Sequence, residues 1–324
     1  FIVAIGENPI DAYAALFRGA FDGELRLGTT LAGFTPLLLT SIAFAVAAKA
    51  GAFNVGVEGE VFLGGITAAY IGINWTFLPK PALYVACFVG AMVVAAAWAL
   101  IPAVLRAYYN VNEVCTTILM NTVALYITSY LVSGPMSAGT ANAQSLPVTV
   151  RLYQFMKPSS VNVGIFIAAI TVIVIIFMLQ KSSWGYKIRT VGLNPTHADY
   201  VGIDSKKVFV GAMMLSGMLG GMAGCIEVLG VHGYFLNNFA TGLGSNGMLA
   251  ALIVKNNMVS TPFMAFFLAV LKSGAMGMQQ STGVPKSLVD TITAVFIIIA
   301  TMETAFQFTK KRKKKTEEKK EDKA

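Results

Sequence analysis

The segment KAGAFNVGVEGEVFLGG, residues 49–65, decides how this chain folds. It combines one Asn, two Glu and five Gly inside a chain that is mostly apolar. Hydrocarbon does not solvate carboxylates, and glycine weakens a helix interior. A membrane chain can therefore carry this segment only where helices pack closely or where the segment lines a polar cavity.

The composition is that of a multi-span membrane protein. The 324 residues are 56% hydrophobic and 12% charged, with a mean hydropathy of +0.67. A soluble chain of this length needs more charge to cover its surface. Cys87, Cys115 and Cys225 have no paired spacing, and His197 and His232 have no metal-ligand partner at helical spacing. We therefore expect neither a metal nor a cofactor.

Apolar segments recur along the whole chain at lengths that suit membrane helices. They fall at 30–48, 55–73, 82–105, 113–132, 161–180, 208–230, 244–254, 259–278 and 287–308. The segment 244–254 is too short to cross alone, which predicts a broken or re-entrant helix, and FIVAI at 1–5 reads as the end of a truncated span. The sequence predicts an all-α polytopic membrane protein with about nine or ten membrane segments.

The charge distribution predicts two regions and an orientation. Residues 310–324 hold nine Lys/Arg and four acidic residues directly after an apolar segment. This pattern favours a cytoplasmic tail near anionic lipid over a nucleic-acid site. The transmembrane domain is then 1–309, and counting spans back from the tail places 181–207 inside the cell and 133–160 outside.

The inner segment 181–207 carries residues that are typical of helix starts and helix ends. Asn194 is suited to cap a helix, and Pro195 fits the first helical position because that N–H has no helical partner. Thr196 to Val201 then forms a short helix, and Gly202 is placed to end it. An ordinary interfacial helix is the alternative to a docking segment.

The polar residues of the opening segment have two readings. Residues four apart on a helix share one face, so we expect Asn54 and Glu58 to point the same way and Glu60 to point elsewhere. Glu58 then either lines a wet pathway or accepts hydrogen bonds from a loop or helix end. The nearby glycines favour the second, structural role.

A second polar stripe runs through residues 111–130. Glu113, Thr117, Asn121 and Ser129 are spaced by four or eight and share one face of an otherwise apolar helix. The stripe faces a pore, or it makes hydrogen bonds between helices. Asn121 is the best candidate in this stripe for contacting substrate.

Residues 216–248 combine small and polar side chains. Two pairs of glycines at spacing four predict close helix packing; they are Gly217 with Gly221 and Gly220 with Gly224. The glycine- and Asn-rich stretch 233–248 predicts a broken helix that lines a cavity. The candidate pathway residues of the whole chain are Asn54, Glu58, Thr117, Asn121, Glu227 and Asn246.

Catalytic motifs are absent from the sequence. It has no GxxxxGK[ST] phosphate loop, no HExxH and no GxSxG. If transport is active, its energy must come from a partner or from an ion gradient.

Three motifs together resemble one family. They are Gly51-Ala-Phe-Asn-Val-Gly-Val-Glu-Gly-Glu60, Val111-Asn-Glu-Val114, and Val191-Gly-Leu-Asn-Pro195 followed by Gly202-Ile203. In this order they resemble the permeases of bacterial ABC importers for branched-chain amino acids, simple sugars and nucleosides. The nucleoside and simple-sugar branch is the most similar. It typically has Gln at position 60, so no substrate role is carried over to Glu60.

The resemblance implies an assembly and a location. It implies a multi-pass protein of the bacterial plasma membrane with a cytoplasmic C-terminus, paired with a second, different permease. A cytoplasmic ATPase would dock on 181–207, where Asn194–Gly202 would be the coupling helix. An extracellular lipoprotein would deliver substrate to outer loops such as 133–160. The residues expected to couple are Arg189, Gly192, Asn194, Pro195, Ala198 and Gly202.

The sequence therefore predicts a transport subunit, not an enzyme. We expect the permease of an ATP-driven nucleoside importer that works by alternating access. Within the same family, a simple-sugar or branched-chain amino acid permease is the alternative. Outside it, the alternatives are a secondary transporter with a proton or sodium site at Glu58 or Glu227, and a scaffold or channel.

Overall fold

The fold is helical, as the sequence predicts. The computed structural model describes residues 8–140, 142–283, 287 and 291. Within these residues, six helices are long and apolar enough to cross a membrane. The segment 1–5 and the basic tail 310–324 lie outside the described residues. Of the predicted span 287–308, the structure describes only residues 287 and 291.

The helices follow one another with short connections over most of the chain. The membrane-capable helices are α2 (Gly23–Lys49), α4 (Lys80–Tyr109), α5 (Glu113–Ser133), α6 (Gly164–Lys181), α9 (Ser205–Ile226) with its π-helical continuation η2 (Glu227–His232), and α11 (Thr261–Thr282). The others are α1 (Pro9–Phe21), α3 (Val57–Asn74), α7 (Ser183–Leu193), α8 (Pro195–Tyr200) and α10 (Leu243–Ile253). The eleven residues of α10 confirm the predicted short segment.

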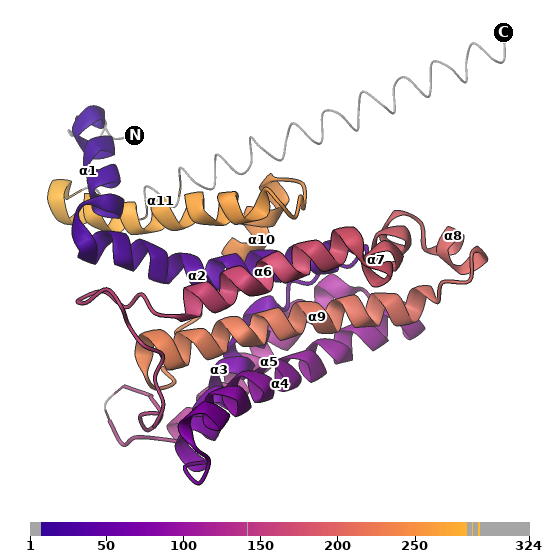
Figure 1. Cartoon of the computed structure of the whole chain (residues 1–324), viewed down its shortest axis with the longest axis horizontal. Helices are drawn as coiled ribbons and strands as arrows, with labels where there is room; N and C mark the ends of the chain where they lie inside the picture. The colour runs from indigo at the N-terminus through magenta and orange to yellow at the C-terminus, as the bar shows by residue number, and fades with distance from the viewer. Residues whose placement is uncertain (1–7, 141, 284–286, 288–290, 292–324) are drawn as a thin grey trace.

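Helix α9 is the centre of the bundle. It packs against α2, α3 and α4, while α1 and α10 lie against α11 (Figure 1). Helix α3, which carries the two Glu of the opening segment in its first turn, is enclosed by α4, α5 and α9. Glu60 in this first turn is thus surrounded by protein and does not face hydrocarbon.

The glycines of α9 explain this close packing. A Cβ on Gly217 or Gly221 would meet the backbone of α4, and a Cβ on Gly220 or Gly224 would meet α3. The predicted close-packing face is therefore confirmed, and the structure divides it into two faces with different partner helices. Small residues let both neighbours approach the same helix at backbone distance.

The two long connections lie at opposite ends of the bundle. Helices α7 and α8 project at the right-hand end of Figure 1, and the connection from α5 to α6 lies at the left-hand end. Isolated backbone pairings, such as Gln144 with Leu236, tie that connection to the residues after η2. This is the arrangement that the predicted topology requires, although which end faces the cell interior stays a prediction.

Two helices were not expected from the sequence. Helix α1 includes Asp11 and Arg18, and its 13 residues are too few to cross a membrane alone. Helix α7 is amphipathic, with Ile188 and Val191 buried and its other side exposed. Short amphipathic helices give a weak hydropathy signal, because half of their residues are polar.

Candidate functional site

The turn before α3 is organised by the amide of Asn54. This side chain is fully buried, and its Nδ2 donates to Glu60 Oε1 and to Ser216 Oγ of α9, each at 2.9 Å. Its Oδ1 accepts from the backbone N–H of Gly56 at 2.9 Å. One amide thus joins the turn, the first turn of α3 and the central helix.

The expected pairing of polar faces was therefore wrong. Asn54 lies in the turn and α3 begins only at Val57, so the helical spacing between Asn54 and Glu58 does not apply. Asn54 pairs with Glu60 instead. Glu60 is 1% exposed, and within the described part of the chain its Oε2 has no hydrogen-bond partner. Gly220 of α9 packs directly on this side chain.

Glu58 occupies a different environment at the start of α3. It is half-buried, and its Oε2 accepts a hydrogen bond from Ser245 Oγ in the first turn of α10 at 3.3 Å. Gly244 allows α10 to approach the backbone of Glu58 closely. This contact supports the structural alternative, a carboxylate held by a helix end. Asn246 lies one residue beyond Ser245, and its Nδ2 donates to Gly242 O within its own turn.

The polar stripe of α5 is directed at the same turn. Asn121 Nδ2 donates to the carbonyl of Val55 at 2.9 Å, and its Oδ1 accepts from Gly59 N–H at 2.8 Å. Thr117 is buried beside Gly56 and donates to the carbonyl of Glu113 in its own helix. The two Asn121 contacts are hydrogen bonds between packed elements, which the sequence left as an alternative to a pore-facing stripe.

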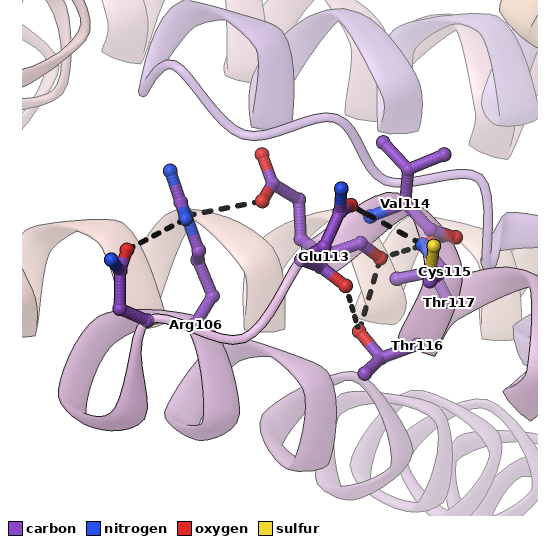
Figure 2. Close-up of polar contacts among 8 residues, drawn as sticks. Arg106, Glu113, Val114, Cys115, Thr116 and Thr117 are labelled. Atoms are coloured by element: carbon purple, nitrogen blue, oxygen red, sulfur yellow. Dashed lines mark hydrogen bonds and ion pairs between the residues drawn. The ribbon is translucent and has the colours of Figure 1, made fainter.

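The Val111–Val114 motif builds the start of α5, of which Figure 2 shows Glu113 and the residues that follow it. Asn112 caps the helix, since its Oδ1 accepts from Val114 N–H at 2.9 Å and from Cys115 N–H at 3.4 Å. Glu113 forms an ion pair with Arg106 of α4 at 3.0 Å. Sequence reasoning missed both roles, although an Asn directly before an acidic first turn is a recognisable helix start.

Glu227 lies apart from this group. It begins η2, eleven residues along α9 from Ser216, which corresponds to roughly 16 Å at 1.5 Å per residue. Its Oε2 is 3.6 Å from His232 Nε2, at the far end of the same π-helix. The structure thus brings together Asn54, Glu58, Thr117 and Asn121 around the start of α3. Asn246 is the neighbour of Ser245, which contacts Glu58, and Glu227 lies elsewhere.

The segment between α6 and α9 has the predicted helix cap and the predicted glycine after the helix. Asn194 Oδ1 accepts from His197 N–H at 3.1 Å, so it caps α8, and Pro195 is the first helical residue. Gly202 adopts φ +81°, a left-handed conformation that ends the segment and suits glycine. Ala198 is buried beneath the helix. The short helix predicted at 196–201 is confirmed.

The same segment is fastened to the bundle on its inner side and exposed on its outer side. Gly192 lies against the backbone of Lys49 and Gly51, where a Cβ would collide with it. Leu193 and Tyr200 are 88% and 86% exposed. These two apolar side chains therefore lie on the outer side of the capped unit and do not pack against the bundle.

Two aspartates connect the end of this segment to the start of α9. Asp204 Oδ1 accepts from Lys207 N–H at 3.0 Å and caps α9. The backbone N–H and then the ammonium of Lys207 hold the pKa of Asp204 below its ordinary value. Asp199 accepts from Ser205 N–H and Ser205 Oγ, both at 3.0 Å, so α8 and α9 are joined through this carboxylate.

Comparisons with known proteins give consistent matches over nearly the whole chain. Residues 26–301 match the family model described as branched-chain amino acid transport system / permease component. The chain is 32% identical to the guanosine ABC transporter permease protein NupP of Bacillus subtilis (strain 168), covering 96% of this chain and 90% of that protein. No solved structure matches significantly.

Two further relatives differ in their named substrates. The chain is 30% identical to the nucleoside ABC transporter permease protein NupB of Lactococcus lactis subsp. cremoris (strain MG1363), over 91% of this chain and 84% of that protein. It is 32% identical to a glucose ABC transporter permease protein of Haloferax volcanii, over 92% and 81%.

Proposed function

Because this chain belongs to the permease family of the branched-chain amino acid transport system, we propose that it is the permease of a nucleoside importer. The chain is a membrane-spanning transport subunit of an ATP-driven importer, and ATP hydrolysis is carried by a separate ATPase subunit. What the importer carries, and how the ATPase moves this chain, are the substance of the proposal.

The substrate proposal rests on two relatives and on the chemistry near α3. The guanosine and nucleoside permeases match over nearly the full chain. A nucleoside is neutral and rich in hydrogen-bonding groups, which suits Asn and Thr better than a strong fixed charge. Of the pathway candidates, the half-buried side chains of Glu58 and Asn246 are the ones we propose to contact it. Asn54 and Asn121 hold the turn before α3, Thr117 is buried beside it, and Glu227 lies apart from them.

A simple sugar is the second candidate substrate. The glucose permease and the guanosine permease have the same sequence identity to this chain, so identity alone does not separate a sugar from a nucleoside. A nucleoside contains a ribose, so both substrates would offer hydroxyl groups to the same amides. The added recognition of an aromatic base is what would separate them.

The coupling proposal rests on one observation, the capped and exposed α7–α8 unit. We assign the ATPase contact to Leu193, Tyr200 and the helix between Asn194 and Gly202. Movement of this unit is transmitted because Gly192 lies on the Lys49–Gly51 backbone, three residues before the Asn54 turn. Rocking of α3 against α9 would then open the pathway alternately to the two sides.

The partners follow from this mechanism. A second, homologous permease would complete the pore, and a heterodimer is the form we propose. An extracellular lipoprotein would deliver substrate to the connection between α5 and α6, at the end of the bundle opposite α8. The orientation with α8 in the cytoplasm belongs to the same proposal.

The test is uptake by cells that express this chain with its ATPase, second permease and lipoprotein. Radiolabelled guanosine should accumulate, and unlabelled nucleosides should compete while glucose and leucine should not. Collapse of the proton gradient with ATP held constant should leave uptake intact. Competition by glucose alone would assign the importer to sugars, and loss of uptake with the gradient would overturn the ATP-driven mechanism.

A further inference from the structure

A cavity of about 420 Å³ lies where α2, α6 and α7 meet the connection from α10 to α11. Because Arg189 of α7 is among its lining residues, the cavity lies at the end of the bundle where Figure 1 shows α7 and α8. It is distinct from the polar turn before α3. Its lining residues are Lys49, Leu179, Gln180, Arg189, Val254, Lys255, Asn257 and Met258.

The lining combines cationic and apolar side chains. Lys49, Arg189 and Lys255 come from three different elements, and the residues that line the cavity include no carboxylate. No ion pair of Lys49, Arg189 or Lys255 is found within the described part of the chain, so none of the three cations is neutralised there. Leu179, Val254 and Met258 supply the apolar wall.

The helix ends account for only part of this arrangement. Lys49 lies in the last turn of α2, where a cation is favourable to the helix dipole. Arg189 Nη2 reaches the carbonyl of Gln180 at 3.5 Å, which is too long for a strong hydrogen bond. Lys255 follows α10 with φ +55°, in a left-handed turn that continues at Asn256. Separate helix-end roles do not require the three cations to share one cavity.

We propose that this cavity binds a phosphate-bearing anion, the phosphodiester of a lipid headgroup or a free phosphate ester. Two lysines and an arginine suit phosphate oxygens, because ammonium and guanidinium groups donate charge-assisted hydrogen bonds to them. The side-chain amide of Asn257 offers a further donor, since its Oδ1 already accepts from Val259 and Ser260 N–H. The apolar wall matches the glycerol and acyl carbons next to a headgroup.

The position of the cavity gives the anion a consequence. Lys49 ends α2 at the backbone that receives Gly192, and Arg189 lies one turn before Gly192 in α7. A bound anion would therefore join the α2 end, the α7–α8 unit and the turn after α10. This goes beyond the transport function and does not depend on which solute is carried.

The experiment compares three variants of the full chain. The first replaces the three cavity cations, K49Q/R189Q/K255Q, and the second keeps their charge, K49R/R189K/K255R. The third is a matched control that removes three cations of the 181–207 segment that do not line the cavity, K181Q/K187Q/K206Q. Each chain is reconstituted in nanodiscs of equal phosphatidylglycerol and phosphatidylcholine, and co-purifying lipid is measured by native mass spectrometry. A second arm follows inorganic phosphate by phosphorus NMR line broadening in detergent.

The wild type, the charge-conserving variant and the control should retain phosphatidylglycerol over phosphatidylcholine. The neutral variant should lose this preference by roughly 100-fold, since three cations near a membrane surface each contribute about fivefold. Loss of phosphate broadening without loss of lipid would support the free-phosphate source. Equal anion binding by all variants would overturn the proposal. Co-purification of the ATPase subunit with each variant is measured as well. Its loss in the neutral variant, with both phosphate arms unchanged, would overturn the proposal in favour of a protein carboxylate.

Discussion

At the scale of single residues, asparagine side chains supply the hydrogen bonds to the buried polar groups around the start of α3. Asn54 donates to one carboxylate oxygen of Glu60 and to Ser216, and Asn54 and Asn121 together bond backbone groups of Val55, Gly56 and Gly59. A buried polar group without a partner costs about 1–3 kcal/mol, so each of these bonds matters more when it is lost than when it is made. The opening segment thus carries polar residues because they hold the turn closed.

The Asn54–Glu60 contact can be tested by exchanging donor and acceptor. Replacing Asn54→Asp removes the donor and places a second carboxylate beside Glu60, which should destabilise the chain by about 3 kcal/mol. Adding Glu60→Gln should recover most of this loss, because the new Gln amide can donate a hydrogen bond to the carboxylate introduced at position 54. Thermal unfolding of the purified chain in detergent measures both variants.

The single substitution Glu60→Gln is the control. It keeps the acceptor for Asn54 and replaces only the unpaired oxygen, so its unfolding temperature should stay close to that of the wild type. If N54D and the double variant unfold together, well below the wild type, the contact does not carry the stability assigned to it.

At the scale of elements, α9 determines how closely the bundle packs. Its two glycine pairs face two helices, and a Cβ on Gly224 would collide with the carbonyl of Val61 in α3. Helix ends matter equally in α8, because six residues make too short a helix to persist without a cap. Both features are written locally in the sequence and depend on neighbours for their effect.

Gly224→Ala should destabilise the chain by about 2 kcal/mol, because α3 and α9 must separate to admit the methyl group. The matched control is Gly33→Ala, at an exposed position of α2 where a Cβ meets nothing within 4 Å. There the same change should stabilise by about 0.5 kcal/mol. Unfolding in detergent gives both values, and similar effects at the two sites would contradict the close-packing role.

Asn194→Ala should weaken coupling while leaving the protein in the membrane. It removes the cap of α8, worth about 1 kcal/mol, and with it the fixed geometry of the projecting unit. Uptake should fall severalfold at unchanged membrane levels. Asn194→Asp should restore it, because a carboxylate caps α8 equally well. Normal uptake in the Ala variant would count against α8 as the ATPase contact.

At the scale of the whole molecule, the two ends proposed to meet partners are separated by the length of the bundle. The α7–α8 unit and the α5–α6 connection lie at opposite ends, so one can meet an ATPase while the other meets a solute-delivering protein (Figure 1). The central position of α9 between α3 and α4 gives both ends a shared mechanical element. Alternating access needs such a connection.

Labelling from one side of the membrane tests this arrangement. In a background with Cys87, Cys115 and Cys225 replaced, a single cysteine is introduced by Leu193→Cys or Thr140→Cys, both at exposed positions. A membrane-impermeant maleimide should label the second in intact cells and the first only after permeabilisation. Labelling of Leu193→Cys in intact cells would reverse the proposed orientation.

The sequence predicted the helical segments and the α8 cap well, and it predicted the polar contacts poorly. Hydropathy and capping depend on neighbours within a few residues, so α4, α5 and the Asn194 cap could be read directly. The face shared by Asn54 and Glu58 could not, because it depended on where α3 begins. The Arg106–Glu113 ion pair was missed because it joins two helices across a connection.

What the sequence alone determined was the class of protein, its apolar helices, its glycine faces and the punctuation of α8, since these follow from local composition and spacing. Only the tertiary structure decided that Asn54 donates a hydrogen bond to Glu60 and that Asn121 holds the turn before α3. It also decided that Lys49, Arg189 and Lys255 line one cavity. The physical reason is that a buried polar group takes its partner from whichever helix packs against it, and that choice is made in three dimensions.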